Sequence, residues 1–443
     1  MIDREPIIRV GILEHRKEIR GVLGGHFVCN GVELPAGEFT AVVEGGEAVL
    51  RDAPGRELAR GGRLQCTQRG VEPFALHGVT IGIQFHWERS EDETFSGDLT
   101  LQPGPDGMLM AINEVPVEEY LKSVISSEMS AEAPLELLKA HAITSRSWLV
   151  AMLEREHRNV GSPTRRSLEA PGEIIRWYDR EDHDFFDVCA DDHCQRYQGI
   201  TRIVSPAVQK AVDATRGVFL AYGDEICDAR FSKSCGGLSE EFQNVWENQG
   251  VPYLKSISDA DVEHPPLRSE ADAARWICSS PRAYCNTLDR QILRQVLPSY
   301  DQETTDYFRW RVKYSQQELA GLLHRRSGID FGSIRALVPL ERGPSGRIFR
   351  LKIEGSKLTL VVGKELEIRR WLSASHLYSS AFVVETDPGP LGVPLAFQLV
   401  GAGWGHGVGL CQIGAAVMAT QSIPADRIVL HYFRGATLRT CYT

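Results

Sequence analysis

The stretch "VPVEEYLKSVISSEMSAEAPLELLKAHAITSRSW", residues Val115 to Trp148, is the one long segment in the first half of the chain with a clear helical period. Its first apolar residues follow the i, i+3, i+4, i+7, i+8 spacing of a single helix face, and they are Val117, Tyr120, Leu121, Val124 and Ile125. Pro116 and Pro134 each suit the first turn of a helix. The stretch therefore predicts two consecutive helices.

Glu128 continues the apolar face of the first predicted helix, together with Met129. A carboxyl group carried into apolar surroundings holds its proton more readily, which is what a general acid needs. Two other interpretations remain open. In the first, Glu128 reaches water at a fraying helix end. In the second, Glu128 forms a structural salt bridge with Arg146 or Lys139.

The second predicted helix carries two basic residues, Lys139 and Arg146, on neighbouring turns. Its expected buried positions are Leu135, Leu138, Ala142 and Leu149. If the two helices pack as a hairpin, the basic groups approach Glu128 or an anionic substrate beside it. The alternative is that they are surface charges whose apolar stems cover the helix.

Bulk composition excludes several classes of protein. The 443 residues are 42% hydrophobic and 24% charged, with no apolar run long enough to span a membrane. The net charge of −10 argues against nucleic-acid binding, which needs clustered Lys and Arg. The first residues lack the basic start and apolar region of a signal peptide, so we expect no export signal in this chain.

The organisation of the chain predicts an α+β fold with two or more lobes. We expect a mixed β-rich core with a helical hairpin and a second lobe, and an active-site cleft between them. Residues 155–180, rich in Arg, Ser, Pro and Gly, are expected to form a solvated loop, and residues 270–329 to be helical. The predicted parts are a β-rich N-terminal part (1–115), a catalytic core with the helical hairpin and a Cys/His cluster (116–260), a helical insertion (261–335), and β-hairpins with a Gly-rich loop (336–443).

A Cys/His cluster lies in "HDFFDVCADDHCQRYQG", where His183, Cys189 and Cys194 fall within a dozen residues. Thiolates and imidazole are good ligands for Zn²⁺, and three protein ligands leave open whether the site is structural or catalytic. His193 is the fallback ligand. The competing interpretation is a Cys189–Cys194 disulfide.

The remaining cysteines, among ten in all, are too sparse for a disulfide-stapled scaffold. We expect most of them to be buried thiols, although the spacing does not exclude a pair such as Cys278 and Cys285.

The glycine-rich stretch "GAGWGHGVGLCQIGA", Gly401 to Ala415, is expected to follow a strand and open a helix. That context suits a dinucleotide-binding turn, but Trp404 and His406 place rings where a pyrophosphate needs bare backbone. A Trp beside a His suits a sugar face and a hydroxyl. The alternative is a structural crossing in which Trp404 is core and His406 is a hydrogen-bonded core histidine.

Five motifs, in order and spacing from about Arg9 to Met418, resemble the stage II sporulation protein D and amidase-enhancer family. They are the helical stretch above, "FFDVCADDHCQRYQG", "ARFSKSCGGLSEEFQNVW", "GPSGRIFRLKIEG" and "GAGWGHGVGLCQIGAAVMA". The resemblance implies a lytic transglycosylase that cleaves the MurNAc–GlcNAc bond of peptidoglycan glycan strands already free of stem peptides. It also implies Zn²⁺ binding at His183, Cys189 and Cys194.

The resemblance places the catalytic glutamate at Glu128, in the Glu-Met pair of the first motif. The matching substrate-binding positions are Lys139, Arg146, Ser234, Trp404, His406 and Gln412. Two positions depart from the family pattern, because His141 stands where glutamine is usual and Cys411 replaces a serine.

One carboxyl group suffices for this chemistry, because the C6 hydroxyl of the muramic acid attacks its own anomeric carbon and gives a 1,6-anhydro end. A different class of function is a non-catalytic amidase enhancer that binds the cell wall, with an amidase as partner. A third is a zinc hydrolase. The resemblance implies a location in the cell envelope, so either an export sequence is missing from this chain or the protein acts on internalised wall fragments.

Overall fold

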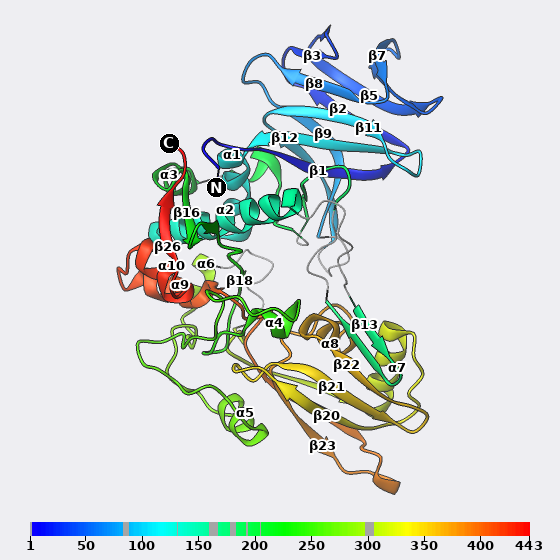
Figure 1. Cartoon of the computed structure of the whole chain (residues 1–443). Helices are drawn as coiled ribbons and strands as arrows, with labels where there is room; N and C mark the ends of the chain where they lie inside the picture. Colours follow the sequence, from blue (N-terminus) through cyan, green and yellow to red (C-terminus); the bar gives the residue numbers. More distant parts are fainter. Residues whose placement is uncertain are drawn as a thin grey trace. The chain divides into compact units, whose positions relative to one another are not determined.

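The computed structural model describes residues 2–82, 88–130, 132–158, 167–177, 183–191, 194–203, 205–296 and 305–443. The chain forms two compact units, which are described separately (Figure 1). Unit 1 comprises Met1–Ala131, Asp182–Val218 and Thr440–Thr443, and unit 2 comprises Glu132–Glu181 and Phe219–Arg439. Helices and strands in several sheets make up the molecule, so the predicted α+β class is confirmed.

Unit 1 is built on two sheets in which all but one strand pair are antiparallel. The first has the order β15-β1-β12-β11-β8-β3-β4, with β15 Val188–Cys189, β1 Ile7–Arg16, β12 Leu109–Pro116, β11 Asp98–Pro103, β8 Leu64–Gln68, β3 Phe27–Cys29 and β4 Val32–Leu34. The second has the order β10-β9-β2-β5-β6-β7, with β10 Arg89–Phe95, β9 Phe74–Ile81, β2 Glu18–Leu23, β5 Gly37–Glu44, β6 Glu47–Asp52 and β7 Glu57–Gly61. Alternating burial along β2 and β8 shows that one face of each strand packs on the core.

The helices of unit 1 surround α1 (Val117–Glu128), which follows β12 directly. Pro116 is its N-cap residue rather than its first helical residue. The helix packs on the short helix η1 (Gly199–Arg202) and on α3 (Pro206–Ala214). α3 begins where the Ser205 hydroxyl caps the Ala207 N–H, which satisfies one of the free donors at a helix start.

The last residues of the chain complete the environment of the first turn of α1. Glu118 is buried there, and its Oε1 accepts hydrogen bonds from the Tyr442 hydroxyl at 2.8 Å and the Gly217 N–H at 3.1 Å. The Cys441 N–H in turn donates to the Gly217 carbonyl at 2.9 Å. A carboxylate with two donors inside the protein is far less costly to bury than an unpaired one.

The described residues of unit 2 form four sheets. The largest has the order β13-β14-β22-β21-β20, with β13 Ser167–Ala170, β14 Glu173–Arg176, β22 Thr359–Gly363, β21 Ile348–Gly355 and β20 Ile334–Arg342. A second joins β19 Arg309–Ser315, β24 Ala396–Ala402 and β23 Phe382–Asp387, and a third joins β17 Glu225–Ile226, β16 Val218–Tyr222 and β26 Thr437–Thr440. The fourth is the short parallel pair of β18 (Phe231–Ser232) and β25 (Leu410–Cys411).

Helix α2 (Leu135–Arg158) belongs to unit 2 and packs on two C-terminal helices, α9 (Gln412–Thr420) and α10 (Ala425–Tyr432). The other helices are α4 Phe242–Val245, α5 Glu270–Ile277, α6 Arg290–Val296, α7 Gln316–Ser327, α8 Glu365–Trp371 and the 3₁₀ turn η3 Pro390–Gly392. Among the described residues, no helix combines the length and apolarity that a membrane crossing requires.

Two predictions of local structure need correction. Part of the expected loop over residues 155–180 is the hairpin of β13 and β14, because Ile174 pairs in parallel with Val362 of a distant strand. The expected helical region over residues 270–329 also contains strand β19, which pairs with β24. The predicted hairpin of β21 and β22 and the strand, loop and helix order at Gly401–Ala415 are confirmed.

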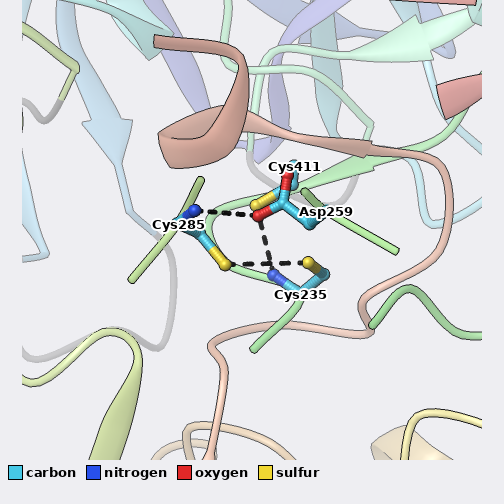
Figure 2. A group of neighbouring side chains, drawn as sticks. All are labelled: Cys235, Asp259, Cys285 and Cys411. Carbon is cyan, nitrogen blue, oxygen red and sulfur yellow. Dashed lines mark hydrogen bonds between the residues drawn. The ribbon is translucent and has the colours of Figure 1, made fainter. Parts of the chain in front are cut away.

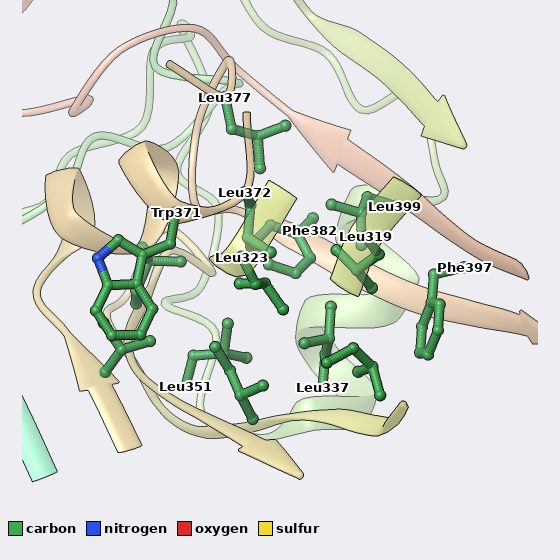
Figure 3. Packing of buried hydrophobic residues seen from close by; sticks show 14 of the residues in the cluster. Leu319, Leu323, Leu337, Leu351, Trp371, Leu372, Leu377, Phe382, Phe397 and Leu399 are labelled. Atoms are coloured by element: carbon green, nitrogen blue, oxygen red, sulfur yellow. The ribbon is translucent and has the colours of Figure 1, made fainter. Parts of the chain in front are cut away.

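The main hydrophobic cluster of unit 2 lies where α7 and α8 meet the strands (Figure 3). α7 carries a capping box between Ser315 and Glu318 and ends at Gly328 in the left-handed conformation, so its limits are set locally. Leu319 and Leu323 on its inner face contact the same cluster as Leu351 of β21.

Replacing Leu351 with alanine should lower the free energy of unfolding by about 2–5 kcal/mol, because a fully buried side chain leaves a cavity. Denaturant unfolding followed by tryptophan fluorescence measures the loss. Leu395→Ala is the matched control, since Leu395 is 59% exposed and its loss should change stability by less than about 0.5 kcal/mol. Equal losses in the two variants would contradict this placement of the core.

Candidate functional site

Glu128 is the last residue of α1 and its side chain is only partly buried. The apolar face predicted for this helix is confirmed, because all five of its apolar residues are fully buried. Met129, which follows in extended conformation, is also buried, and its N–H donates to the Ile125 carbonyl at 3.0 Å. Glu128 thus ends a buried helix at a point that solvent reaches.

The predicted ligands His183, Cys189 and Cys194 are brought together in unit 1. Their ligand atoms all lie within 4.8 Å of one another, and His183 Nε2 is 3.4 Å from Cys194 Sγ. Cys189 and Cys194 are not joined by a disulfide, so the disulfide interpretation is wrong. The fallback ligand, position 193, lies outside the described residues.

The segment that follows this cluster is docked on α1 by hydrogen bonds. The Gln198 N–H donates to the Ser123 hydroxyl at 3.0 Å, and Arg196 Nη1 donates to the Ser127 carbonyl at 3.4 Å. The ring of Tyr197 stacks on that of Tyr120 with centroids 5.1 Å apart. The helix that ends in Glu128 is therefore packed against the Cys/His segment.

The phenol of Tyr120 lies near both Glu128 and the Cys/His cluster. Burial raises the pKa of its phenol well above the ordinary value, and the charges of Cys194, Cys189 and Glu128 raise it further. One buried phenol therefore lies within electrostatic range of the predicted catalytic carboxyl and of two predicted metal ligands. This arrangement lies entirely within unit 1.

A pocket borders His183, and local sequence patterns did not point to it. Its lining includes Glu14, Asp106 and Phe186, which come from β1, from the turn before β12 and from the segment before β15. Burial raises the pKa of Glu14, while the nearby His183 lowers it by a smaller amount. Glu14 lies far from the cluster along the chain, so no spacing motif could have indicated it.

In unit 2 the stretch "ARFSKSCGGLSEEFQNVW", residues 229–246, which we call the serine motif, pairs with the glycine-rich loop. Ser234 and Trp404 exchange backbone hydrogen bonds of 3.0 and 2.8 Å, and the neighbouring strands β18 and β25 run parallel. The Ser234 hydroxyl is buried and has no hydrogen-bond partner among the described residues. Two motifs that are distant in sequence therefore form one local structure.

A buried arginine that the sequence did not single out, Arg347, holds this loop pair. It is 1% exposed and donates to the carbonyls of Ser234 at 3.4 Å, Cys235 at 3.0 Å and Gly405 at 3.0 Å. Gly407 must be glycine here, since its φ is 75° and a Cβ would lie 2.3 Å from Arg347 Cζ. The alternating glycines thus leave room for a guanidinium.

Trp404 and His406 differ in their surroundings. Trp404 is partly exposed and stacks on Tyr378 with centroids 4.2 Å apart. His406 packs edge-on against Trp246, and its Nδ1 accepts the Val408 N–H at 3.0 Å. Burial and the nearby Arg230 lower the pKa of His406 well below its ordinary value, so its imidazole is neutral. His406 is nevertheless partly exposed, as Trp404 is, so neither ring is a fully buried core residue.

The two basic residues of α2 also differ. Lys139 is partly exposed and pairs with Glu136 of the same helix at 2.7 Å. Arg146 is fully buried, so the surface-charge alternative is wrong for this residue. The expected apolar positions Leu138 and Leu149 are buried as well, and α2 begins at Leu135, one residue after Pro134.

His141, which stands where the resembled family usually has glutamine, contacts Gln412. His141 Nε2 lies 3.0 Å from Gln412 Nε2, and His141 Nδ1 lies 3.2 Å from Ser145 Oγ. Burial lowers the pKa of His141 to about 3. The neutral ring accepts from the Gln412 amide and donates to Ser145, so the His141–Gln412 contact joins α2 to the start of α9.

Acid should destabilise the protein through His141. Its folded-state pKa of about 3 lies below the ordinary value of 6.5, so the unfolded state takes up the proton first. The stabilisation is complete above pH 6.5 and is lost as the pH falls toward 3, at up to about 1.4 kcal/mol per pH unit.

His141→Gln is the matched variant, because glutamine keeps a hydrogen bond to Gln412 without titrating. We expect the free energy of unfolding, measured at a series of pH values between neutral and acid, to fall less steeply in His141→Gln than in the wild type. Parallel curves would show that His141 is not buried as a neutral ring.

Two parts of the chain match known family models. Residues 105–222 match the family model described as "Stage II sporulation protein", and residues 240–409 match one described as "Domain of unknown function (DUF8618)". Residues 105–222 are therefore similar to the Stage II sporulation protein family, and the resemblance found in the motifs is confirmed.

Individual relatives agree with this assignment. The chain is 24% identical to "Stage II sporulation protein D" of Bacillus amyloliquefaciens, over 78% of this chain and 82% of that protein. It is 24% identical to the protein of the same name from Bacillus subtilis (strain 168), over 74% and 76% of the two chains. It is also 24% identical to "Amidase enhancer" of Bacillus subtilis (strain 168), over 72% of this chain and 40% of that protein.

Proposed function

We propose that the protein is a peptidoglycan lytic transglycosylase that cleaves the MurNAc–GlcNAc bond of peptide-free glycan strands in the cell envelope. The observation that carries the proposal is the position of Glu128. It lies within the part of the chain that matches the family model, and it is a partly exposed residue at the end of a helix whose apolar face is fully buried.

In the proposed reaction, protonated Glu128 donates its proton to the glycosidic oxygen as the C1–O bond breaks. The resulting carboxylate then accepts the proton of the C6 hydroxyl as that oxygen bonds to C1 of the same sugar. The nucleophile is tethered to the reacting centre, so no second carboxylate is required to activate water. The products are a 1,6-anhydro end and a free hydroxyl on the leaving sugar.

The proposed substrate-binding residues divide into two groups by exposure. Trp404 and Lys139 are partly exposed, and they are suited to contact a sugar face and an anionic lactyl group. Arg146, Ser234 and Gln412 are buried. We propose that these three support the site, and that the hydrogen-bonded His406 does the same.

We also propose that His183, Cys189 and Cys194 hold Zn²⁺. The donor set fits, because two thiols and an imidazole nitrogen converge within 4.8 Å. The proposed role is structural, since the same segment joins β15 to the residues docked on α1. The catalytic step does not involve the metal.

A second candidate function is suggested by one relative, which is named an amidase enhancer. In that case the protein binds glycan strands and stimulates a cell-wall amidase without cleaving the strands itself. The two functions make different predictions for Glu128.

Glu128→Gln should lower the release of 1,6-anhydro ends from purified peptide-free glycan strands by at least about 100-fold, because an amide cannot donate the proton. Mass spectrometry of the products measures the rate. Glu119→Gln is the matched control, since Glu119 lies on the same helix and only pairs with Lys122 at 2.7 Å, a contact worth at most about 1 kcal/mol.

Unchanged release by Glu128→Gln would exclude Glu128 as the acid. If neither protein releases anhydro ends but both bind the strands and accelerate a purified amidase, the enhancer function is favoured instead.

Trp404→Ala should weaken binding of glycan strands about tenfold, which corresponds to about 1.4 kcal/mol, because the variant removes a partly exposed aromatic ring. Calorimetric titration with soluble strands gives the dissociation constant. Trp404→Phe keeps a ring against Tyr378 and should retain most of the affinity. Wild-type affinity in Trp404→Ala would remove this residue from the proposed substrate contacts.

A further inference from the structure

A second group of metal-ligating side chains lies in unit 2, apart from the His183 cluster (Figure 2). It consists of Cys235, Asp259, Cys285 and Cys411, whose ligand atoms all lie within 4.8 Å of one another. The four residues come from four separate segments. Cys235 follows β18, and Cys411 ends β25. Asp259 precedes α5, and Cys285 lies between α5 and α6.

The group is closed to solvent. Cys235 is 2% exposed, Cys285 is 1% exposed, and Cys411 and Asp259 are fully buried. Four protein ligands without solvent access are the pattern of a structural zinc site, whereas a catalytic site keeps one position open. The donor set of three sulfurs and one carboxylate oxygen also suits Zn²⁺.

The spacing of the sulfurs agrees with metal binding. Cys235 Sγ and Cys285 Sγ are 3.8 Å apart, and all of these cysteines are free thiols. A tetrahedral zinc ion with Zn–S bonds of about 2.3 Å requires a separation of about 3.8 Å between sulfurs. A disulfide would require about 2.05 Å.

Hydrogen bonds from neighbouring groups orient the ligands, as is usual around metal sites. Asp259 accepts from the Tyr432 hydroxyl at 2.6 Å and from the Cys285 N–H at 2.8 Å. The Cys235 N–H donates to Cys411 Sγ at 3.3 Å. Cys411 is also the N-cap residue of α9, where the helix dipole favours a thiolate.

Two arginines provide part of the charge balance. Arg309 lies within electrostatic range of Cys285 and Cys235, and Arg347 lies within range of Cys235. Three thiolates and a carboxylate carry four negative charges, so a divalent cation together with these guanidinium groups offsets most of that charge inside the protein.

We propose that Cys235, Asp259, Cys285 and Cys411 bind one Zn²⁺ in a closed structural site that ties the glycine-rich loop and the start of α9 to the serine motif. Binding releases the protons of the thiols and of any protonated carboxyl group to solvent, and no electron transfer is involved. The cysteine at position 411, in place of the serine usual in the resembled family, supplies the fourth ligand.

The test uses the full chain with Cys189→Ser and Cys194→Ser, which removes the thiols of the other cluster and separates the two metal proposals. This protein should retain one zinc per chain by mass spectrometry of the metal content. Adding Cys235→Ser and Cys285→Ser should abolish that zinc. Adding Cys278→Ser instead should leave it unchanged, because Cys278 is exposed and outside the group.

Reconstitution of the same background with Co²⁺ gives a second measurement that does not depend on activity. A site with three thiolates should give strong thiolate-to-cobalt charge-transfer absorption, and Cys411→Ser, which restores the family's usual residue, should lower it by about a third. Circular dichroism checks that each variant folds.

If the folded protein with Cys189→Ser and Cys194→Ser binds neither zinc nor cobalt, the proposal is overturned. A Cys235–Cys285 disulfide found by peptide mapping of the untreated protein would overturn it equally. Neither result bears on the Glu128 assay, so this inference and the proposed transglycosylase activity can fail separately.

Discussion

The guanidinium of Arg347 donates hydrogen bonds to the carbonyls of Ser234, Cys235 and Gly405, and the pairing of two distant segments of unit 2 depends on these contacts. They join the serine motif to the glycine-rich loop, beside Trp404, which stacks on Tyr378. The glycines of the loop are required because any side chain at position 407 would occupy the space of the guanidinium. The loop therefore surrounds the guanidinium of Arg347 rather than a phosphate group.

Burying this cation is costly, and the surrounding residues reduce the cost. Ser345 accepts from Arg347 Nη1 at 3.1 Å and donates to the buried carboxyl of Glu240 at 2.5 Å. The Glu240 carboxyl also accepts from Asn244 at 2.7 Å, while burial raises its pKa. Removing one member of such a network leaves its partners unpaired, which costs more than the net stabilisation the whole network provides.

Local patterns predicted the features that depend on neighbours in sequence. The apolar face of α1 and the His183, Cys189 and Cys194 cluster could be found because their members lie within one or two dozen residues of each other. Distant contacts could not be found in this way. Nothing in "GPSGRIF" distinguishes Arg347 as buried, and no spacing rule connects Cys235 with Cys285 and Cys411. β14 was missed for the same reason, since its partner strand β22 follows far later in the chain.

The hydrogen bonds that meet at Glu118 constrain the order in which the chain can fold. The first turn of α1 forms its contact with the Tyr442 hydroxyl across 324 positions of sequence, after the whole of unit 2. Contacts of such long range form slowly because a large loop must close first. The Tyr442–Glu118 hydrogen bond can form only after the residues of unit 2 have been synthesised, so this contact of the helix that bears Glu128 is absent from a shorter nascent chain.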